Sequence, residues 1–388
     1  MELKAAAQET IGAARDGLIE LSHRIHAHPE LGFQEERAAG WLAEALADGG
    51  FTVETGLCDL PTAFRARAGH GPLHIAICAE YDSLPDMGHA CGHNLIAAMA
   101  LGAALGAARV ADDAGLTVTV MGTPGEEVGD GGGKILLLER GGFEDIHAAM
   151  MVHPSPVDVA EPVIIAASSF NVHYHGKAAH ASGFPELGIN AADALTIAQT
   201  SIGLLRQHIR SADRVHGIIT RGGEAFNIIP AHTSARYMVR AGTVEELDDI
   251  YGKVMRCFEA GALATGAKLE VEGGQKSYAH MVHDHPMAAA YRRNAESLGR
   301  SFPNLGAMAQ RAAISTDMGN ISLAMPSIHP AIGIDSLPAV NHQPEFAAHC
   351  VGAAADQALM DGAVAMAWTV IDMATDASLR DRLLPAGR

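Results

Sequence analysis

The chain has 388 residues and a mass of 40.4 kDa, more than one typical core needs, so a large domain with a smaller second one is expected. Lysine and arginine total 27 against 45 aspartate and glutamate, and no basic run interrupts this acidic excess. The net charge of -18 argues against nucleic acids and anionic membranes as partners.

The cysteines and the amino terminus indicate the compartment. The five cysteines are odd in number, far apart and never in a Cys-x-x-Cys pair, which predicts neither a disulfide framework nor a zinc finger. The first residues carry charges throughout, unlike a secretory signal. The longest polar-poor stretch, 95–108, is shorter than the roughly 18 to 20 residues that a bilayer requires. We therefore expect a soluble, cytoplasmic protein.

Four apolar runs predict buried strands, at residues 73–79, 116–122, 148–153 and 327–334. Helical segments fill the intervals, among them a helix over 94–111 with Asn94 as its N-cap. This alternation predicts an α/β fold with a mostly parallel sheet covered on both faces. In such sheets ligands bind outside the carboxyl ends of the strands.

Side chains able to bind a metal come just after these strands: Asp82, Cys91 and His93; Glu126 and Glu127; His153; and His342. All four groups are expected along one rim of the sheet, which predicts a single metal site. A Cys-x-His pair in a turn can converge on one ion. A lone buried cysteine, in contrast, is usually only a small apolar filler.

Two adjacent carboxylates, Glu126 and Glu127, follow a turn at 123–125 that allows them to point in different directions. A bound divalent cation lowers the pKa of its water toward about 7, and a nearby carboxylate can carry the released proton to a leaving amine. We assign Glu126 as general base and acid and Glu127 as a ligand. A solvated pair on a loop is the alternative, which their position after a strand disfavours. The glycine run at 129–133 does not have P-loop spacing.

The pattern changes between about residues 168 and 274. The predicted order is a strand (170–177), a helix (190–209), two strands (216–222 and 233–241), a helix (243–264) and a strand (268–272). This βαββαβ order is the ferredoxin-like motif, and Thr243 with Glu246 forms a capping box for the second helix. We expect a discontinuous catalytic domain, 1–167 and 280–388, with an inserted lid, 168–279. The residues alone make His180 an exposed histidine in a turn of this lid.

Six motifs resemble those of the metallopeptidase family 20 amidohydrolases, subfamily D, which includes aminoacylases and hippurate, auxin-conjugate and aminobenzoyl-glutamate hydrolases. They cover nearly the whole chain, at 26–33, 90–94, 124–127, 176–180, 227–230 and 342–345. The segments 80–82 and 315–320 are similar to the branch that hydrolyses β-alanyl dipeptides. Thr123 stands where many relatives carry Gln, and Asn94 where many carry Asp.

The resemblance implies an enzyme that cleaves the amide bond of N-acyl amino acids, aminobenzoyl-glutamate-like conjugates or small dipeptides. It implies ligands for one or two divalent ions, zinc or manganese: Cys91, His93, Glu127, His153 and His342. It also implies that Glu126 is the base, that Asp82 holds a ligand in place, and that a homodimer forms through the lid. In that lid, His180 would stabilise the oxyanion, and Asn227 and Arg240 would hold the substrate.

Two other functions remain open at this point. A binding protein could keep the fold and the metal without turnover, although Glu126 argues against this because a binder needs no proton shuttle. A thiol hydrolase with Cys91 as nucleophile and a histidine base is the other alternative. It predicts inactivation by iodoacetamide and indifference to chelators, whereas the metal interpretation predicts the reverse.

Overall fold

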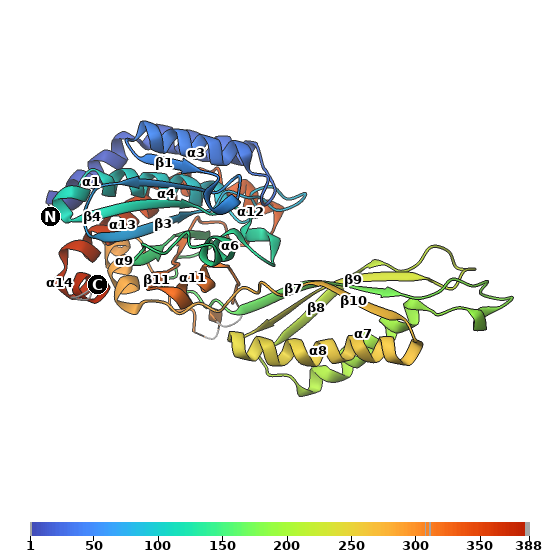
Figure 1. Cartoon of the computed structure of the whole chain (residues 1–388). Helices are drawn as coiled ribbons and strands as arrows, with labels where there is room; N and C mark the ends of the chain where they lie inside the picture. The colour runs from blue at the N-terminus through green and yellow to red at the C-terminus, as the bar shows by residue number, and fades with distance from the viewer. Residues whose placement is uncertain (1, 307, 310–311, 385–388) are drawn as a thin grey trace. The chain divides into compact units, whose positions relative to one another are not determined.

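The computed structural model describes residues 2–306, 308–309 and 312–384, which form two compact units (Figure 1). The first unit contains the described residues up to Val128, then Gly132–Val163 and the residues from Met281 on. The second contains Gly129–Gly131 and Ile164–His280, so it is inserted into the first.

The first unit is built on a six-stranded sheet of order β1-β2-β4-β3-β5-β11. Its strands are β1 (Thr52–Thr55), β2 (Phe64–Ala68), β3 (Leu73–Ala79), β4 (Leu116–Gly122), β5 (Ala148–Met150) and β11 (Ser327–Ile328). The four strands from β4 to β11 are parallel, and β1 and β2 add an antiparallel edge. The bounds predicted for β3 and β4 are correct, because each is an apolar run buried on both faces.

The other two predicted strands are each interrupted. The run over 148–153 divides into β5 and β6 (His153–Ser155), and the run over 327–334 divides into β11 and β12 (Ala331–Gly333). β6 and β12 pair with each other as a separate parallel ladder. The break falls at Pro330, which has no backbone N–H to donate to a ladder.

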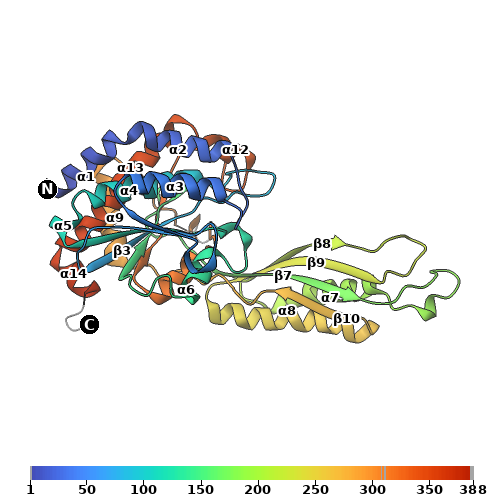
Figure 2. The same cartoon turned by 45° about the horizontal axis from the view of Figure 1, so that its top comes forward.

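Helices lie on both sides of the six-stranded sheet, with α4 on one side and α6 and α11 on the other (Figures 1 and 2). The helices of this unit are α1 (Glu2–Ala13), α2 (Arg15–Ala27), α3 (Glu36–Asp48), α4 (His93–Ala108), α5 (Ala111–Ala114), α6 (Gly133–Glu139), α9 (His285–Ser297), α11 (Met318–Ala324), α12 (Pro344–His349), α13 (Ala353–Thr375) and α14 (Ala377–Leu383). α1, α2 and α13 pack against α4. Among the described helices, only α13 is long and apolar enough to cross a membrane; 78% of its most apolar window is buried, as in a core helix, so this is weak evidence for a membrane span.

The prediction that Asn94 caps α4 is wrong. The helix begins at His93, one residue earlier, because Gly92 adopts the left-handed conformation (φ 82°) that precedes the first turn. Asn94 lies inside that turn and is buried. Its amide nitrogen donates to Ser22 Oγ at 2.9 Å and to the Cys350 carbonyl at 3.1 Å, so it connects α4 to two other segments.

The second unit has the predicted βαββαβ order. It consists of β7 (Ala166–His175), α7 (Ala191–Leu205), β8 (Arg214–Arg221), β9 (His232–Ala241), α8 (Val244–Thr265) and β10 (Lys268–Gly273). The sheet is antiparallel throughout, in the order β10-β7-β9-β8. The predicted fold class, a mostly parallel α/β domain with a ferredoxin-like insertion, is confirmed. Thr243 caps α8 by accepting a hydrogen bond from the Glu246 N–H.

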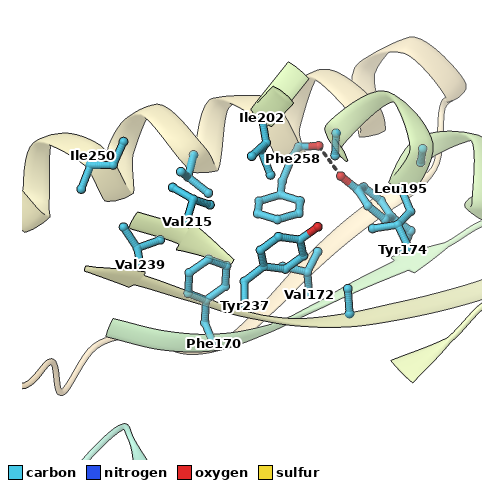
Figure 3. Close-up of a cluster of buried hydrophobic side chains, with 14 of the residues drawn as sticks. Phe170, Val172, Tyr174, Leu195, Ile202, Val215, Tyr237, Val239, Ile250 and Phe258 are labelled. Carbon is cyan, nitrogen blue, oxygen red and sulfur yellow. Dashed lines mark hydrogen bonds between the residues drawn. The ribbon is translucent and has the colours of Figure 1, made fainter. Parts of the chain in front are cut away.

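An aromatic core joins the lid sheet to its two helices (Figure 3). The rings of Tyr237 and Phe258 meet edge to face with centroids 5.0 Å apart, and Phe170 packs against both. The buried Tyr174 hydroxyl donates to the Phe258 carbonyl at 2.7 Å, so its polar atom is satisfied. This core gives the lid a hydrophobic interior of its own.

Candidate metal centre

The candidate site lies in the first unit, in the loops that follow its parallel strands. Cys91 lies in the turn before α4, and Glu126 and Glu127 begin a short 3-10 helix after β4. His153 is the first residue of β6. His342 lies in the loop before α12, where its backbone N–H donates to the Ala90 carbonyl at 2.8 Å. Loops that are far apart in the sequence, from Cys91 to His342, therefore meet at one rim of the sheet.

The structure brings Cys91, His93 and His153 together in a buried group whose ligand atoms lie within 4.8 Å of one another. The Nδ1–H of His153 donates to the Pro154 carbonyl at 2.7 Å, which leaves Nε2 with its lone pair, 3.4 Å from Cys91 Sγ. Burial lowers the pKa of His153 to about 4, so this imidazole is neutral, as a metal ligand must be.

A second group shares Cys91 and adds Glu127 and His342, again with ligand atoms within 4.8 Å of one another. His342 Nε2 lies 3.3 Å from Glu127 Oε1. The His342 side chain is 54% exposed, whereas that of Glu127 is 11% exposed, so this group borders solvent on one side. One cysteine between two groups is an arrangement that suits two neighbouring ions.

Asp82 connects the two groups. Its Oδ1 accepts a hydrogen bond from His93 Nδ1 at 2.9 Å, and its Oδ2 accepts one from the Glu127 backbone N–H at 2.9 Å. Burial would lower the pKa of His93, but the Asp82 carboxylate outweighs it and raises that pKa well above its usual range. A metal at His93 Nε2 would therefore displace a proton.

The site fits a cation because it has buried polar atoms, in the donor set and beside it, that the protein does not satisfy. Glu80 Oε2 and His93 Nε2 are buried and have no hydrogen-bond partner among the described residues. Each such atom costs roughly 1 to 3 kcal/mol when it is left unpaired. Sulfur, imidazole and carboxylate donors are the ligands that zinc takes in proteins.

The pKa values of the two adjacent carboxyl groups, Glu126 and Glu127, are shifted in opposite directions. Burial, together with the charges of Glu80 and Glu127, raises the pKa of Glu126 well above its usual range. Burial also disfavours the charged form of Glu127, but the hydrogen bond from His342 and the charge of His93 lower its pKa. Such a divergence between neighbours is typical of a proton carrier beside an ionised ligand, the division predicted for Glu126 and Glu127.

The surroundings of Cys91 argue against a thiol nucleophile. Burial and the charge of Glu127 raise the pKa of this thiol well above its usual range. Reactive cysteines need the opposite, a lowered pKa and partial exposure. A thiol of this kind becomes a thiolate when a cation binds it.

Several buried residues around the centre were not predicted as site residues. Lys134 Nζ lies 2.5 Å from Glu80 Oε1 and 2.6 Å from Asp317 Oδ1. Burial would raise the pKa of Glu80, but Lys134 lowers it to about 2. Glu35 Oε1 accepts the Gly125 N–H at 2.7 Å and so supports the turn before Glu126. Glu80 and Asp317 lie in the motifs at 80–82 and 315–320, which were the available signal, whereas Glu35 and Lys134 lie in none of the motifs.

The lid residues lie in the second unit. His180 and Asn227 are exposed in adjoining loops, where the Ala181 N–H donates to the Asn227 carbonyl at 3.1 Å and His180 pairs with Ile228. Arg240 pairs with Ala167 and Arg214 near the other end of β9. It is eight residues beyond the first residue of that strand, roughly 26 Å along it. Within the lid, Arg240 is therefore far from the other two.

Comparison with known proteins identifies the family. The family model of Peptidase family M20/M25/M40 matches residues 76–366, so the chain belongs to this family and is a hydrolase. The predicted resemblance and the predicted enzyme class are thereby confirmed.

Relatives of known name agree with this assignment. The Xaa-Arg dipeptidase of Mus musculus is 39% identical over 388 residues, 96% of this chain and 89% of the relative. The Xaa-Arg dipeptidase of Homo sapiens is 36% identical over 96% of this chain and 88% of the relative. One of the subunits of the p-aminobenzoyl-glutamate hydrolase of Escherichia coli K12 is 34% identical over 68% of this chain and 58% of the relative.

Solved structures share the fold. An aminobenzoyl-glutamate utilization protein from Klebsiella pneumoniae superposes with a TM-score of 0.72 and 17% identity, covering 93% of this chain and 97% of the other. A Bacillus subtilis protein described as a dinuclear metal binding peptidase from the M20 family gives a TM-score of 0.67 and 21% identity, covering 94% of this chain and 99% of the other.

Proposed function

We propose that this protein is a metal-dependent dipeptidase whose preferred substrates carry a C-terminal arginine. The observation that carries the metal-dependent hydrolysis is the convergence of two donor groups on Cys91 beside the buried carboxylate of Glu126. The substrate class is supported by the mouse and human relatives, which match almost the whole chain. Conjugates such as p-aminobenzoyl-glutamate are the second class, supported by the shorter match to the Escherichia coli relative.

The residues fit two divalent ions, one held by Cys91, His93 and His153 and the other by Cys91, Glu127 and His342. Such ions activate a water and polarise the substrate carbonyl when they are bound. The cysteine and imidazole donors favour zinc, and the carboxylate with imidazole also suits manganese. The name of the Bacillus subtilis protein of the same fold supports a dinuclear centre.

In this proposal Glu126 carries the proton. Its ionised carboxylate accepts a proton from the attacking water and delivers it to the leaving amine, because burial makes this carboxylate a stronger base than usual and the amine is more basic still. Asp82 orients His93 and the backbone of Glu127 through its two oxygens. Glu127 remains ionised beside His342.

In the lid, we assign His180 as a hydrogen-bond donor to the substrate carbonyl oxygen. Its Nδ1 lies 3.3 Å from the Ser182 N–H and 3.1 Å from the Gly183 N–H, and accepts from both. A neutral imidazole that accepts at Nδ1 carries its hydrogen on Nε2. The two backbone N–H groups of this loop therefore favour the tautomer of His180 in which Nε2 carries the hydrogen and can donate it to the substrate. Asn227 and Arg240 are proposed to hold the substrate and, because they lie far apart within one lid, they would do so from different subunits of the proposed homodimer.

The cytoplasm is the proposed location and a homodimer through the lid the proposed assembly. β8 is an edge strand of the lid sheet, and its residues Ile218 and Ile219 are 65% and 52% exposed. Exposed apolar edge strands favour pairing with another chain. Light scattering on the purified protein tests this: a dimeric wild type with a monomeric Ile218→Lys variant is expected, and a monomeric wild type would reject it.

The function is tested by removing and restoring the metal. Purified protein is treated with a chelator, and Zn²⁺ or Mn²⁺ is added back in separate samples. Each sample is assayed on Xaa-Arg dipeptides, other dipeptides, p-aminobenzoyl-glutamate and N-acyl amino acids. We expect loss and recovery of activity, with the highest kcat/KM on Xaa-Arg dipeptides. Full activity in protein shown to be free of metal would reject the mechanism, and a preference for another series would reject only the substrate class.

A further inference from the structure

Glu80, Lys134 and Asp317 form a buried ion triad beside the candidate metal centre. All three side chains are at most 1% exposed. Besides its two ion pairs, Lys134 donates its backbone N–H to Asp317 Oδ2 at 2.9 Å. Burying three charges is costly, and a buried ion pair is weak evidence for stability, so the triad requires a functional explanation. The proposed reaction uses none of the three residues.

The two carboxylate oxygens of Glu80 have different surroundings. Oε1 is held by Lys134, whereas Oε2 is buried with no hydrogen-bond partner in the described part of the chain. Oε2 lies 3.5 Å from His93 Nε2, which also has no such partner. An ion bound to this nitrogen at roughly 2.1 Å would come within reach of the free oxygen.

The donor atoms of Glu80, His93 and Glu126 lie within 4.8 Å of one another. We infer that Glu80 is a further donor to the ion that His93 holds, and that Lys134 is its positioning residue. The inference rests on the proposed metal-dependent function. Glu80 would raise the number of protein donors available to this ion to four. The group with the exposed His342 would keep the open position that a water or a substrate needs.

Lys134 fixes the direction of the Glu80 carboxylate. Glu80 directly follows β3, and Lys134 is the second residue of α6, so the ammonium reaches the carboxylate from another segment. By holding Oε1, Lys134 leaves Oε2 as the one oxygen that faces His93. Asp317, before α11, anchors the same ammonium. Two carboxylates and one ammonium leave a net negative charge, which Glu80 Oε2 presents toward His93.

The test measures cobalt binding by the full chain, because the visible absorption of bound Co²⁺ reports its donors. Metal-free wild type is titrated with Co²⁺ and compared with Glu80→Gln, which keeps the shape and removes the charge. We expect two ions per wild-type chain. In Glu80→Gln we expect one of them to bind on the order of 10- to 100-fold more weakly, with a shifted absorption band.

The matched comparison is Asp317→Asn. Both substitutions remove one carboxylate and leave Lys134 paired with the other, so their structural cost is similar. We expect Asp317→Asn to change cobalt affinity by less than about threefold, well below the effect of losing a metal-orienting group. Equal effects in the two variants, or wild-type cobalt binding in Glu80→Gln, would overturn the inference.

If Glu80→Gln does not fold, Glu80→Asp replaces it: it keeps the charge but is one methylene shorter, and we expect weaker cobalt binding there too, with wild-type binding overturning the inference. A wild type that binds no cobalt would reject the proposed function and this inference with it. A wild type that binds two ions, with Glu80 variants that do the same, would reject the inference alone.

Discussion

Asp82 accepts the Nδ1–H of His93 at 2.9 Å, with both side chains fully buried. This contact orients the imidazole so that Nε2 faces Cys91, Glu80 and Glu127. A carboxylate that fixes a histidine in this way determines both its tautomer and its direction. Asp82, just after β3, therefore orients the imidazole of His93, the first residue of α4.

Asp82→Asn is expected to lower metal affinity on the order of 10- to 100-fold, because an amide orients His93 less well and leaves its Nε2 a less basic ligand. Chelator competition followed by metal analysis measures this. The exposed Asp86, four residues away, provides the control, and Asp86→Asn should bind as the wild type does. Equal affinity in Asp82→Asn and wild type would contradict the role.

Glu126→Gln is expected to keep its full metal content and to lose on the order of 10²- to 10⁴-fold in kcat, because the amide cannot accept the proton. Metal analysis and initial rates on the same sample separate the two effects. Metal-replete variant that turns over at the wild-type rate would refute the role of Glu126 as proton carrier.

The sequence predicts the central strands and the ligands that follow them well, and it predicts the antiparallel strand β2 and the buried contacts of Lys134 poorly. β3 and β4 are apolar runs, so their ends, and the ligands that follow, are legible without a structure. β2 has the sequence FRARA, in which two arginines obscure the strand pattern. The role of Lys134 depends on Glu80 and Asp317, which are 54 and 183 residues away. A buried lysine is rare enough that no local pattern predicts it.

Alkylation distinguishes metal chemistry from thiol chemistry. Cys91 is 8% exposed and its sulfur would be occupied by the bound cation, so iodoacetamide is expected to leave the metal-loaded enzyme active. Mass spectrometry should find label at the half-buried Cys58 and Cys257 before Cys91. Inactivation in step with labelling of Cys91, together with resistance to chelators, would restore the thiol hydrolase.

His180→Ala is expected to lower kcat on the order of 10²- to 10³-fold without changing the metal content, because a donor to the developing oxyanion is lost. His180→Gln should recover part of this rate, since its amide can donate. The exposed His208 of the same unit is the control, and His208→Gln should behave as the wild type. A loss of metal in His180→Ala would instead indicate a structural role.

Glu35 gives the metal-free protein a pH-dependent stability. Burial, followed by the charge of Asp82, raises the pKa of this carboxyl from 4.5 to about 7. Above pH 4.5 the unfolded chain loses this proton while the folded chain keeps it to about pH 7. This group therefore makes the folded state less stable as the pH rises through that window, by up to roughly 3 kcal/mol.

Glu35→Gln removes this titration, so its free energy of unfolding relative to wild type should increase between about pH 4.5 and 7.5. Urea denaturation of chelator-treated protein at several pH values measures the difference. Glu36→Gln, at the exposed neighbouring position, should follow the wild type throughout. Parallel curves for wild type and Glu35→Gln would show that Glu35 is already ionised in the folded protein. The turn at Gly125 would then be held by a charge instead of a neutral acid.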